Sequence, residues 1–95
     1  MDSKDVDDKQ FNIGRALGCR MRLALLHTLA TGDASVGELV ESTGTTQPNA
    51  SNHLAVLRDA GLVAADRVGR VMRYRLASPE VRDLVRALGA VSDTR

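Results

Sequence analysis

Two helical patterns joined by one tight, glycine-bearing turn constrain this chain more than any other feature of its sequence. Ser35 and Glu38 have the spacing of a capping box, in which two side chains satisfy backbone N–H groups at the start of a helix. We expect this helix to end near residue 42, before a turn at Thr43-Gly44-Thr45. Thr46 then caps a longer helix that is expected to stop at Gly61. A short helix, a turn with glycine and a longer helix predict a helix-turn-helix.

The hydrophobic period changes from helical to alternating after the second of these helices. Residues 62–67 and 71–76 predict two strands, joined through residues 68–70 into a β-hairpin. Because side chains alternate between the faces of a strand, Arg73 and Arg75 share one face and apolar residues share the other. The hairpin is therefore expected to have an arginine-lined outer side.

Further helical patterns lie on both sides of this region. Residues 10–17 and 19–30 predict two helices before the helix-turn-helix. Ser78 and Pro79 open a last helix, with a cap followed by proline at the first helical position. Four helices, two strands and one helix predict a mainly α domain with a β-hairpin, which is a winged helix-turn-helix.

Size and composition favour a single domain that forms a dimer. The 95 residues are 43% hydrophobic and 26% charged, as in soluble globular proteins, but only 2% are aromatic. A chain of this size buries only about 60–65% of its unfolded surface, so a second copy would add needed stability. We expect residues 1–9 to form a flexible acidic tail and residues 10–95 to form the domain.

The sequence gives no sign of a membrane span or of secretion. No apolar run approaches the ~20 residues that a bilayer span needs. The acidic N-terminal residues MDSKDVDDKQ lack the hydrophobic stretch of a signal peptide. The single cysteine, Cys19, excludes a disulfide framework within the chain and fits a reducing environment. We therefore expect a cytoplasmic protein.

The net charge of +1 conceals an uneven distribution. Residues 45–76 hold five arginines against two aspartates, a balance of +3, whereas residues 1–44 carry −2 and the charges of residues 77–95 cancel. Arginine forks suit phosphates and guanine edges. Charge alone is equally compatible with a solvated surface, so the neighbours of the arginines decide between the two interpretations.

The outward face of the second helix of the helix-turn-helix supplies such neighbours. Ala50, Leu54 and Leu57 share one face, and the opposite face carries amide and hydroxyl side chains. Asn and Gln have the paired donor and acceptor that can read an adenine edge. Arg70, beside Gly69 at the hairpin tip, is expected to contact a phosphate. The predicted DNA-binding residues are Gln47, Asn49, Ser51, Asn52, His53, Arg58, Arg67, Arg70 and Arg73.

Each of these residues also has an ordinary structural explanation. Asn and Ser in a first turn often only cap a helix, and the hairpin arginines could merely keep the surface soluble. His53 borders the core, where a packed, hydrogen-bonded histidine or a phosphate contact is expected before a base reader. The combination of a polar helix face and an arginine-lined hairpin favours DNA over these separate explanations.

Residues 46–63, TQPNASNHLAVLRDAGLV, resemble the recognition-helix signature of the ArsR/SmtB family of bacterial repressors. Residues 67–70 (RVGR) and 74–76 (YRL) resemble that family's wing. Residues 17–22 (LGCRMR) lie where the family has Leu-x-x-Pro-x-Arg, although this chain lacks the proline. The resemblance covers roughly residues 12–90, which is nearly the whole domain.

The resemblance implies a homodimer that binds double-stranded DNA at a near-palindromic operator and represses transcription. Its first and last helices would form the dimer interface, although the apolar stripe of the last helix could instead pack on the chain's own core. A two-fold dimer would place its recognition helices in successive major grooves, ~34 Å apart. The interface residues expected on this basis are Phe11, Leu17, Val81, Leu84, Val85 and Leu88.

Many members of the family release DNA when a metal binds, but this chain lacks the ligands. The family's cysteine pair at the start of the third helix would fall at Ser35 and Gly37. A cadmium- and lead-sensing branch has cysteines in the recognition helix, and these would fall at Val56 and Ala60. The zinc sites of the last helix need histidine, and residues 77–95 contain none. We therefore expect no metal and no cofactor, and either an unknown effector or repression without a ligand.

Two other functions stay open on the sequence alone. A metal or redox sensor could use a non-standard site around Cys19, although His27 and His53 match no familiar zinc spacing and a buried free cysteine usually acts as a small hydrophobe. A winged-helix module could bind protein instead of DNA. An enzyme is not expected, because the chain has neither a glycine-rich phosphate loop nor a Ser-His-Asp or Cys-His arrangement.

Overall fold

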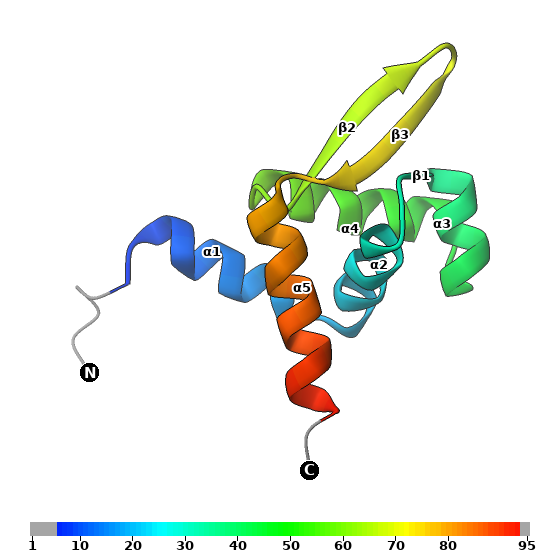
Figure 1. The fold of residues 1–95 in the computed structure, drawn as a ribbon. Coiled ribbons are helices and arrows are strands. Elements are labelled where there is room, and N and C mark those ends of the chain that lie inside the picture. The colour runs from blue at the N-terminus through cyan, green and yellow to red at the C-terminus, as the bar shows by residue number, and fades with distance from the viewer. Residues whose placement is uncertain (1–5, 94–95) are drawn as a thin grey trace.

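The computed structural model describes residues 6–93, which form five helices and three strands (Figure 1). Two helices and a short strand precede the helix-turn-helix, and a hairpin, here called the wing, leads into the last helix. This order confirms the predicted winged helix-turn-helix, mainly α with a β-hairpin. The elements are α1 (Asp8–Leu17), α2 (Arg20–Ala30), β1 (Ala34–Ser35), α3 (Val36–Thr43), α4 (Gln47–Asp59), β2 (Val63–Val68), β3 (Val71–Leu76) and α5 (Pro79–Ser92).

The helix-turn-helix, α3 and α4, is fixed by the caps that the sequence predicts. The Ser35 backbone N–H donates to Glu38 Oε1 at 2.8 Å, and the Glu38 backbone N–H donates to Ser35 Oγ at 3.2 Å, so both halves of the capping box form. Gly44 ends α3 with a φ of 75°, which L side chains rarely adopt. Thr46 Oγ1 caps α4 by accepting from the Asn49 backbone N–H at 3.3 Å. The turn is thus defined at both ends.

A third strand, which the sequence pattern does not predict, joins the wing to the helix-turn-helix. β1 is two residues long and pairs antiparallel with β3 opposite Arg73 and Tyr74, so the sheet order is β1-β3-β2. Two residues that directly precede a helix show no alternation from which a strand could be predicted. The first strand of the wing spans residues 63–68, one residue later than expected.

Aliphatic side chains fill the core, as the low aromatic content predicts. Leu25, Leu26 and Leu29 of α2 are fully buried in one cluster with Leu39 of α3 and Leu54 of α4. Truncating a buried leucine to alanine typically costs ~2–5 kcal/mol, because both transfer energy and packing are lost. This cluster therefore sets the rotation of α4 and keeps its opposite face at the surface.

α1 extends away from the helix-turn-helix (Figure 1). It begins at Asp8, inside the expected tail of residues 1–9, because Asp7 Oδ1 caps it by accepting from the Gln10 backbone N–H at 2.7 Å. The flexibility expected for residues 1–5 lies outside the described residues. In residues 6–93 no helix has the length and apolar content to cross a membrane.

Candidate nucleic-acid interface

The outward face of α4 presents uncharged polar side chains. Ala50, Leu54 and Leu57 are buried, so the helix cannot rotate without breaking the core. The residues on the other side belong to the predicted DNA-binding set and are all exposed. They are Gln47, Asn49, Ser51 and Asn52.

Three of these four side chains keep all of their hydrogen-bonding groups available. Within residues 6–93, the side chains of Gln47, Ser51 and Asn52 have no hydrogen-bond partner. Asn49 differs, because its Nδ2 donates to Thr45 Oγ1 at 2.7 Å. Asn49 thus takes part in the start of α4, which is the structural explanation that the sequence left open, and its contact with a base stays a prediction.

His53 lies on the side of α4 that faces α2. It is half-buried, and its Nδ1 is 3.3 Å from Nη1 of Arg22. The same guanidinium donates to the backbone carbonyls of Ala16 at 2.7 Å and Arg15 at 3.2 Å, at the end of α1. His53 therefore has the packed, hydrogen-bonded position that the sequence favours over base contact, and Arg22 links the end of α1 to α4.

The tip of the wing presents arginine without a partner. Val68 pairs with Val71 across the hairpin, and Gly69 starts the turn between them with a φ of 64°, where glycine is favoured. Arg70 follows in the turn. In the part of the chain that the structure describes, Arg70 and Arg67 are exposed and form neither an ion pair nor a side-chain hydrogen bond. Both are therefore free to meet a phosphate.

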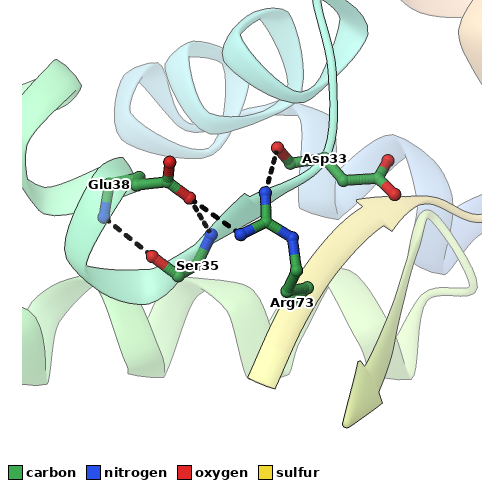
Figure 2. A network of polar contacts seen from close by, with 4 residues as sticks. All are labelled: Asp33, Ser35, Glu38 and Arg73. Carbon is green, nitrogen blue, oxygen red and sulfur yellow. Dashed lines mark hydrogen bonds and ion pairs between the residues drawn. The ribbon is translucent and has the colours of Figure 1, made fainter. Parts of the chain in front are cut away.

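Arginines nearer the base of the wing are paired within the molecule. Arg75 Nε donates to Asp66 Oδ2 at 2.8 Å across the hairpin. Arg73 reaches out of the hairpin: its Nη1 donates to Glu38 Oε1 at 3.2 Å, and its Nη2 donates to the backbone carbonyl of Asp33 at 2.9 Å (Figure 2). Arg73 belongs to the DNA-binding set predicted from the sequence. Its guanidinium points at the start of α3 and the segment before it, and its contact with DNA stays a prediction.

A hollow between the wing and the helix-turn-helix brings two of the predicted residues together. It has a volume of about 360 Å³, and Ser51 of α4 and Arg70 of the wing both line it. The rest of its wall comes from the start of α3 and from β3, namely Ser35, Val36, Gly37, Val71, Met72 and Tyr74. Arg58, exposed in the last turn of α4, is not among its lining residues. The polar helix face and the wing tip thus border one concave surface.

A second, apolar surface lies on α5. Leu84, Leu88 and Val91 line a shallow hollow of about 230 Å³. Val91 is 73% exposed, the largest value among the large exposed hydrophobic residues of residues 6–93, and it is not among the interface residues predicted from the sequence. A helix face of this kind is what a second copy of the chain would cover.

The other predicted interface residues divide between core and surface. Val85 is only 1% exposed and belongs to the core of the single chain, so its side chain offers no surface to a partner. Leu17 and Val81 are half-buried and pack against that core. Phe11 on α1 is 59% exposed. α1 therefore carries an apolar ring at the surface, in addition to the face of α5.

The candidate sensing positions are Cys19 and the residues that stand where the family has cysteines. Cys19 is half-exposed at the start of α2, and its side chain makes no capping hydrogen bond. Among residues 6–93, no three side chains from His, Cys, Asp and Glu lie where they could hold one metal ion. Val56 and Ala60 line a hollow of about 290 Å³ beside the end of α1.

Comparison of the sequence with known proteins finds regulators of transcription. A family model described as bacterial regulatory protein, arsR family, matches residues 20–65, from α2 into β2. The biofilm growth-associated repressor of Xylella fastidiosa is 38% identical over 84 residues, which cover 88% of this chain and 74% of the repressor. The HTH-type transcriptional regulator CmtR of Mycobacterium tuberculosis is 44% identical over 77 residues, 81% of this chain and 63% of CmtR. The chain spans 57–74% of the length of three curated relatives.

Comparison of the structure leads to the same class of protein. The homodimeric winged helix-turn-helix DNA-binding domain of a possible ArsR-family regulator from Mycobacterium bovis matches with a TM-score of 0.89 at 34% identity. The match covers 98% of this chain and 87% of that domain. The similarity therefore extends over the wing, α1 and α5 as well as the helix-turn-helix.

Proposed function

Since this chain belongs to the ArsR family of bacterial regulatory proteins, we propose that it binds an operator as a homodimer and represses transcription. The relative from Xylella fastidiosa is named a repressor. The relative from Mycobacterium bovis is a homodimeric DNA-binding domain. Both properties come to this chain as part of the proposal, with the surfaces of α4, the wing and α5 as its support.

The observation that carries the proposal is a polar face of α4 together with a basic wing tip, where Ser51 of the helix and Arg70 of the wing line the same hollow. α4 offers the unpaired amides of Gln47 and Asn52, which suit base edges in a major groove. The wing tip offers the unpaired Arg67 and Arg70, which suit phosphates. A surface that bound another protein would need neither the base-reading amides nor the basic tip.

The dimer in this proposal forms through α5, with α1 beside it. Leu84, Leu88 and Val91 form the apolar face that a second copy covers. Sedimentation velocity tests this step: the wild type is expected to sediment as a dimer, and Leu88→Glu as a monomer that keeps its helical circular dichroism. Arg86→Glu, on an exposed part of the same helix, is the control that leaves the dimer intact. A wild type that remains monomeric at tens of micromolar would contradict the proposed assembly.

The proposed repressor does not use the metal sites known in its family. Ser35, Gly37, Val56 and Ala60 occupy the positions of the family's cysteines, and none of their side chains is a metal ligand of that type. We expect operator binding to persist with zinc, cadmium, nickel or arsenite. Release of the operator at micromolar metal would contradict this part of the proposal and direct attention to a site around Cys19.

Fluorescence anisotropy tests the proposed function as a whole. The purified protein is titrated into labelled DNA from upstream of its own gene and into a scrambled sequence, each at two salt concentrations. Tight, selective and salt-sensitive binding is expected, because neutralised phosphates release counterions. Failure to bind either DNA at low salt would contradict the proposal and favour a protein-binding winged-helix module.

A further inference from the structure

The wing has few polar connections to the rest of the molecule. In the part of the chain that the structure describes, Arg73 supplies all of the side-chain hydrogen bonds from β2 or β3 to another element. The backbone connection is also short, because β1 pairs with β3 over only Ala34 and Ser35. The base of the wing is buried in the core through Val63 and Leu76, and Arg73 adds the polar contact that ties β3 to the start of α3.

This contact is shared with the capping box of α3 (Figure 2). Glu38 Oε1 accepts from the Ser35 backbone N–H at 2.8 Å and from Arg73 Nη1 at 3.2 Å. The hydrogen bonds from Ser35 and the charge of Arg73 hold the pKa of the Glu38 carboxyl below its ordinary value, so it is charged at neutral pH. One carboxylate thus caps the first helix of the helix-turn-helix and holds the wing.

Both terminal nitrogens of the Arg73 guanidinium make hydrogen bonds within the molecule. Nη1 faces Glu38, and Nη2 donates to the Asp33 carbonyl at 2.9 Å. A phosphate contact would require the side chain to leave a carboxylate and a backbone carbonyl. Arg70, by contrast, has no partner to leave within residues 6–93.

We propose that Arg73 is a positioning residue, which sets the wing against the helix-turn-helix through Glu38 and does not itself contact DNA. This inference rests on the proposed function, because the orientation of the wing affects binding only if the tip of the wing contacts DNA. Arg70 lies in the turn at the tip, three residues before Arg73 of β3, or about 10 Å away at the rise of a strand. A change of angle at the base would therefore displace the phosphate-binding tip relative to α4.

Glu38→Gln separates the two roles of Arg73 by the sign of its effect. If Arg73 contacted a phosphate, removing the competing negative charge would tighten DNA binding. If Arg73 positions the wing, the same change weakens binding by about two- to fivefold, as expected for loss of an exposed ion pair. Glutamine can still complete the capping box, so the start of α3 is retained.

Arg73→Lys tests the geometry of the fork. Lysine keeps the charge but cannot span Glu38 and the Asp33 carbonyl with a planar pair of donors. We expect about a two- to fivefold loss of operator affinity, with the slope of log affinity against log salt unchanged. The matched control is Arg70→Lys, which keeps both the affinity and the slope because a phosphate accepts either cation.

The double variant completes the experiment. Arg73→Lys with Glu38→Gln is expected to bind within about twofold of Arg73→Lys alone, since both changes remove the same contact. The inference is overturned if Glu38→Gln tightens binding, if Arg73→Lys binds like the wild type, or if the two losses are additive. A lower salt slope in Arg73→Ala would equally assign Arg73 to a phosphate.

A measurement without DNA keeps this inference distinct from the proposed function. Hydrogen exchange of the backbone amides of residues 34–35 and 71–76 reports whether β1 and β3 stay paired. Both Glu38→Gln and Arg73→Lys are expected to raise exchange there relative to Asp66→Asn, which breaks an ion pair within the wing. If the wild type binds no DNA, the proposed function fails, and unchanged exchange in both variants would overturn the role of Arg73 as well.

Discussion

α4 and the wing both line the hollow, through Ser51 and Arg70, but different contacts hold them in place. The rotation of α4 is fixed by buried Ala50, Leu54 and Leu57, so its polar side chains can change without moving the helix. The base of the wing is also anchored in the core, through Val63 and Leu76, but its position against α3 depends in addition on the exposed polar contacts of Arg73. Substitutions on the polar face of α4 are therefore expected to change which base sequence is preferred. Substitutions at the base of the wing are expected to change the position of its tip relative to α4.

Asn52→Ala is expected to give the largest effect and to sharpen this comparison on the side of α4. Loss of an amide that reads a base should cost ~1–3 kcal/mol and relax the preference at one base position in each half-site. Anisotropy against a panel of single-base operator variants measures both. Asn12→Ala makes the same chemical change on α1 and should leave the affinities for all operator variants as in the wild type. A uniform loss over all sequences would show that Asn52 does not read bases.

Arg70→Ala tests the wing tip and should have a smaller, different effect. Removing an arginine that binds a phosphate is expected to cost about 1 kcal/mol on every sequence alike. The slope of log affinity against log salt should fall by about 0.9 for each phosphate that is no longer neutralised. Titrations of specific and scrambled DNA at several salt concentrations measure this. A loss confined to one base position would contradict the assignment.

Asp66→Asn tests whether the ion pair within the wing, Asp66 with Arg75, affects DNA affinity as the pair of Glu38 with Arg73 is expected to do. Asp66 pairs with Arg75 inside the hairpin, so its loss frees an arginine and removes a negative charge without releasing the wing from α3. We expect DNA affinity to stay the same or to rise by about twofold. Because Glu38→Gln is expected to lower DNA affinity, the two variants would distinguish the roles of the two ion pairs. A loss in both variants would mean that binding is disturbed by loss of either arginine's carboxylate partner, inside the wing or in α3.

The smallest expected effect concerns stability in acid. The pKa of Glu38 lies below its ordinary value of 4.5 in the folded chain, chiefly because of the Ser35 backbone hydrogen bond. Its contribution is therefore complete above the unfolded pKa and is lost as pH falls through the lowered folded value. Urea unfolding from pH 7 to pH 3 should show a wild-type advantage over Glu38→Gln that shrinks below about pH 4.5. An advantage that grows in acid would contradict the sign of this shift.

Local signals made most of the fold predictable from the sequence. Ser35, Glu38 and Thr46 cap their helices with neighbours three residues away, and the strands follow from an alternation within six residues. Gly69 marks the hairpin turn for the same reason. Elements whose causes lie within a few residues are recognisable without the rest of the chain.

Features that depend on distant partners were not predictable. Arg73 and Arg70 look alike in the sequence, and only the fold places Glu38, 35 residues earlier, beside Arg73. β1 forms because β3 arrives next to it, not because Ala34 and Ser35 have strand character. Val85 lies on the predicted stripe of α5, yet the core of the single chain already buries it. Residue type and hydrophobic period do not show which polar side chains already have a partner within the chain, or which apolar side chains its core already buries.

The most direct test of the division between α4 and the wing compares Asn52→Ala with Arg70→Ala on operator and scrambled DNA at two salt concentrations. We predict that Asn52→Ala loses discrimination between the two DNAs while keeping the wild-type salt slope. Arg70→Ala should keep discrimination while the slope falls. If Arg70→Ala loses discrimination instead, or if neither variant differs from the wild type, the division between a reading helix and a phosphate-holding wing is contradicted.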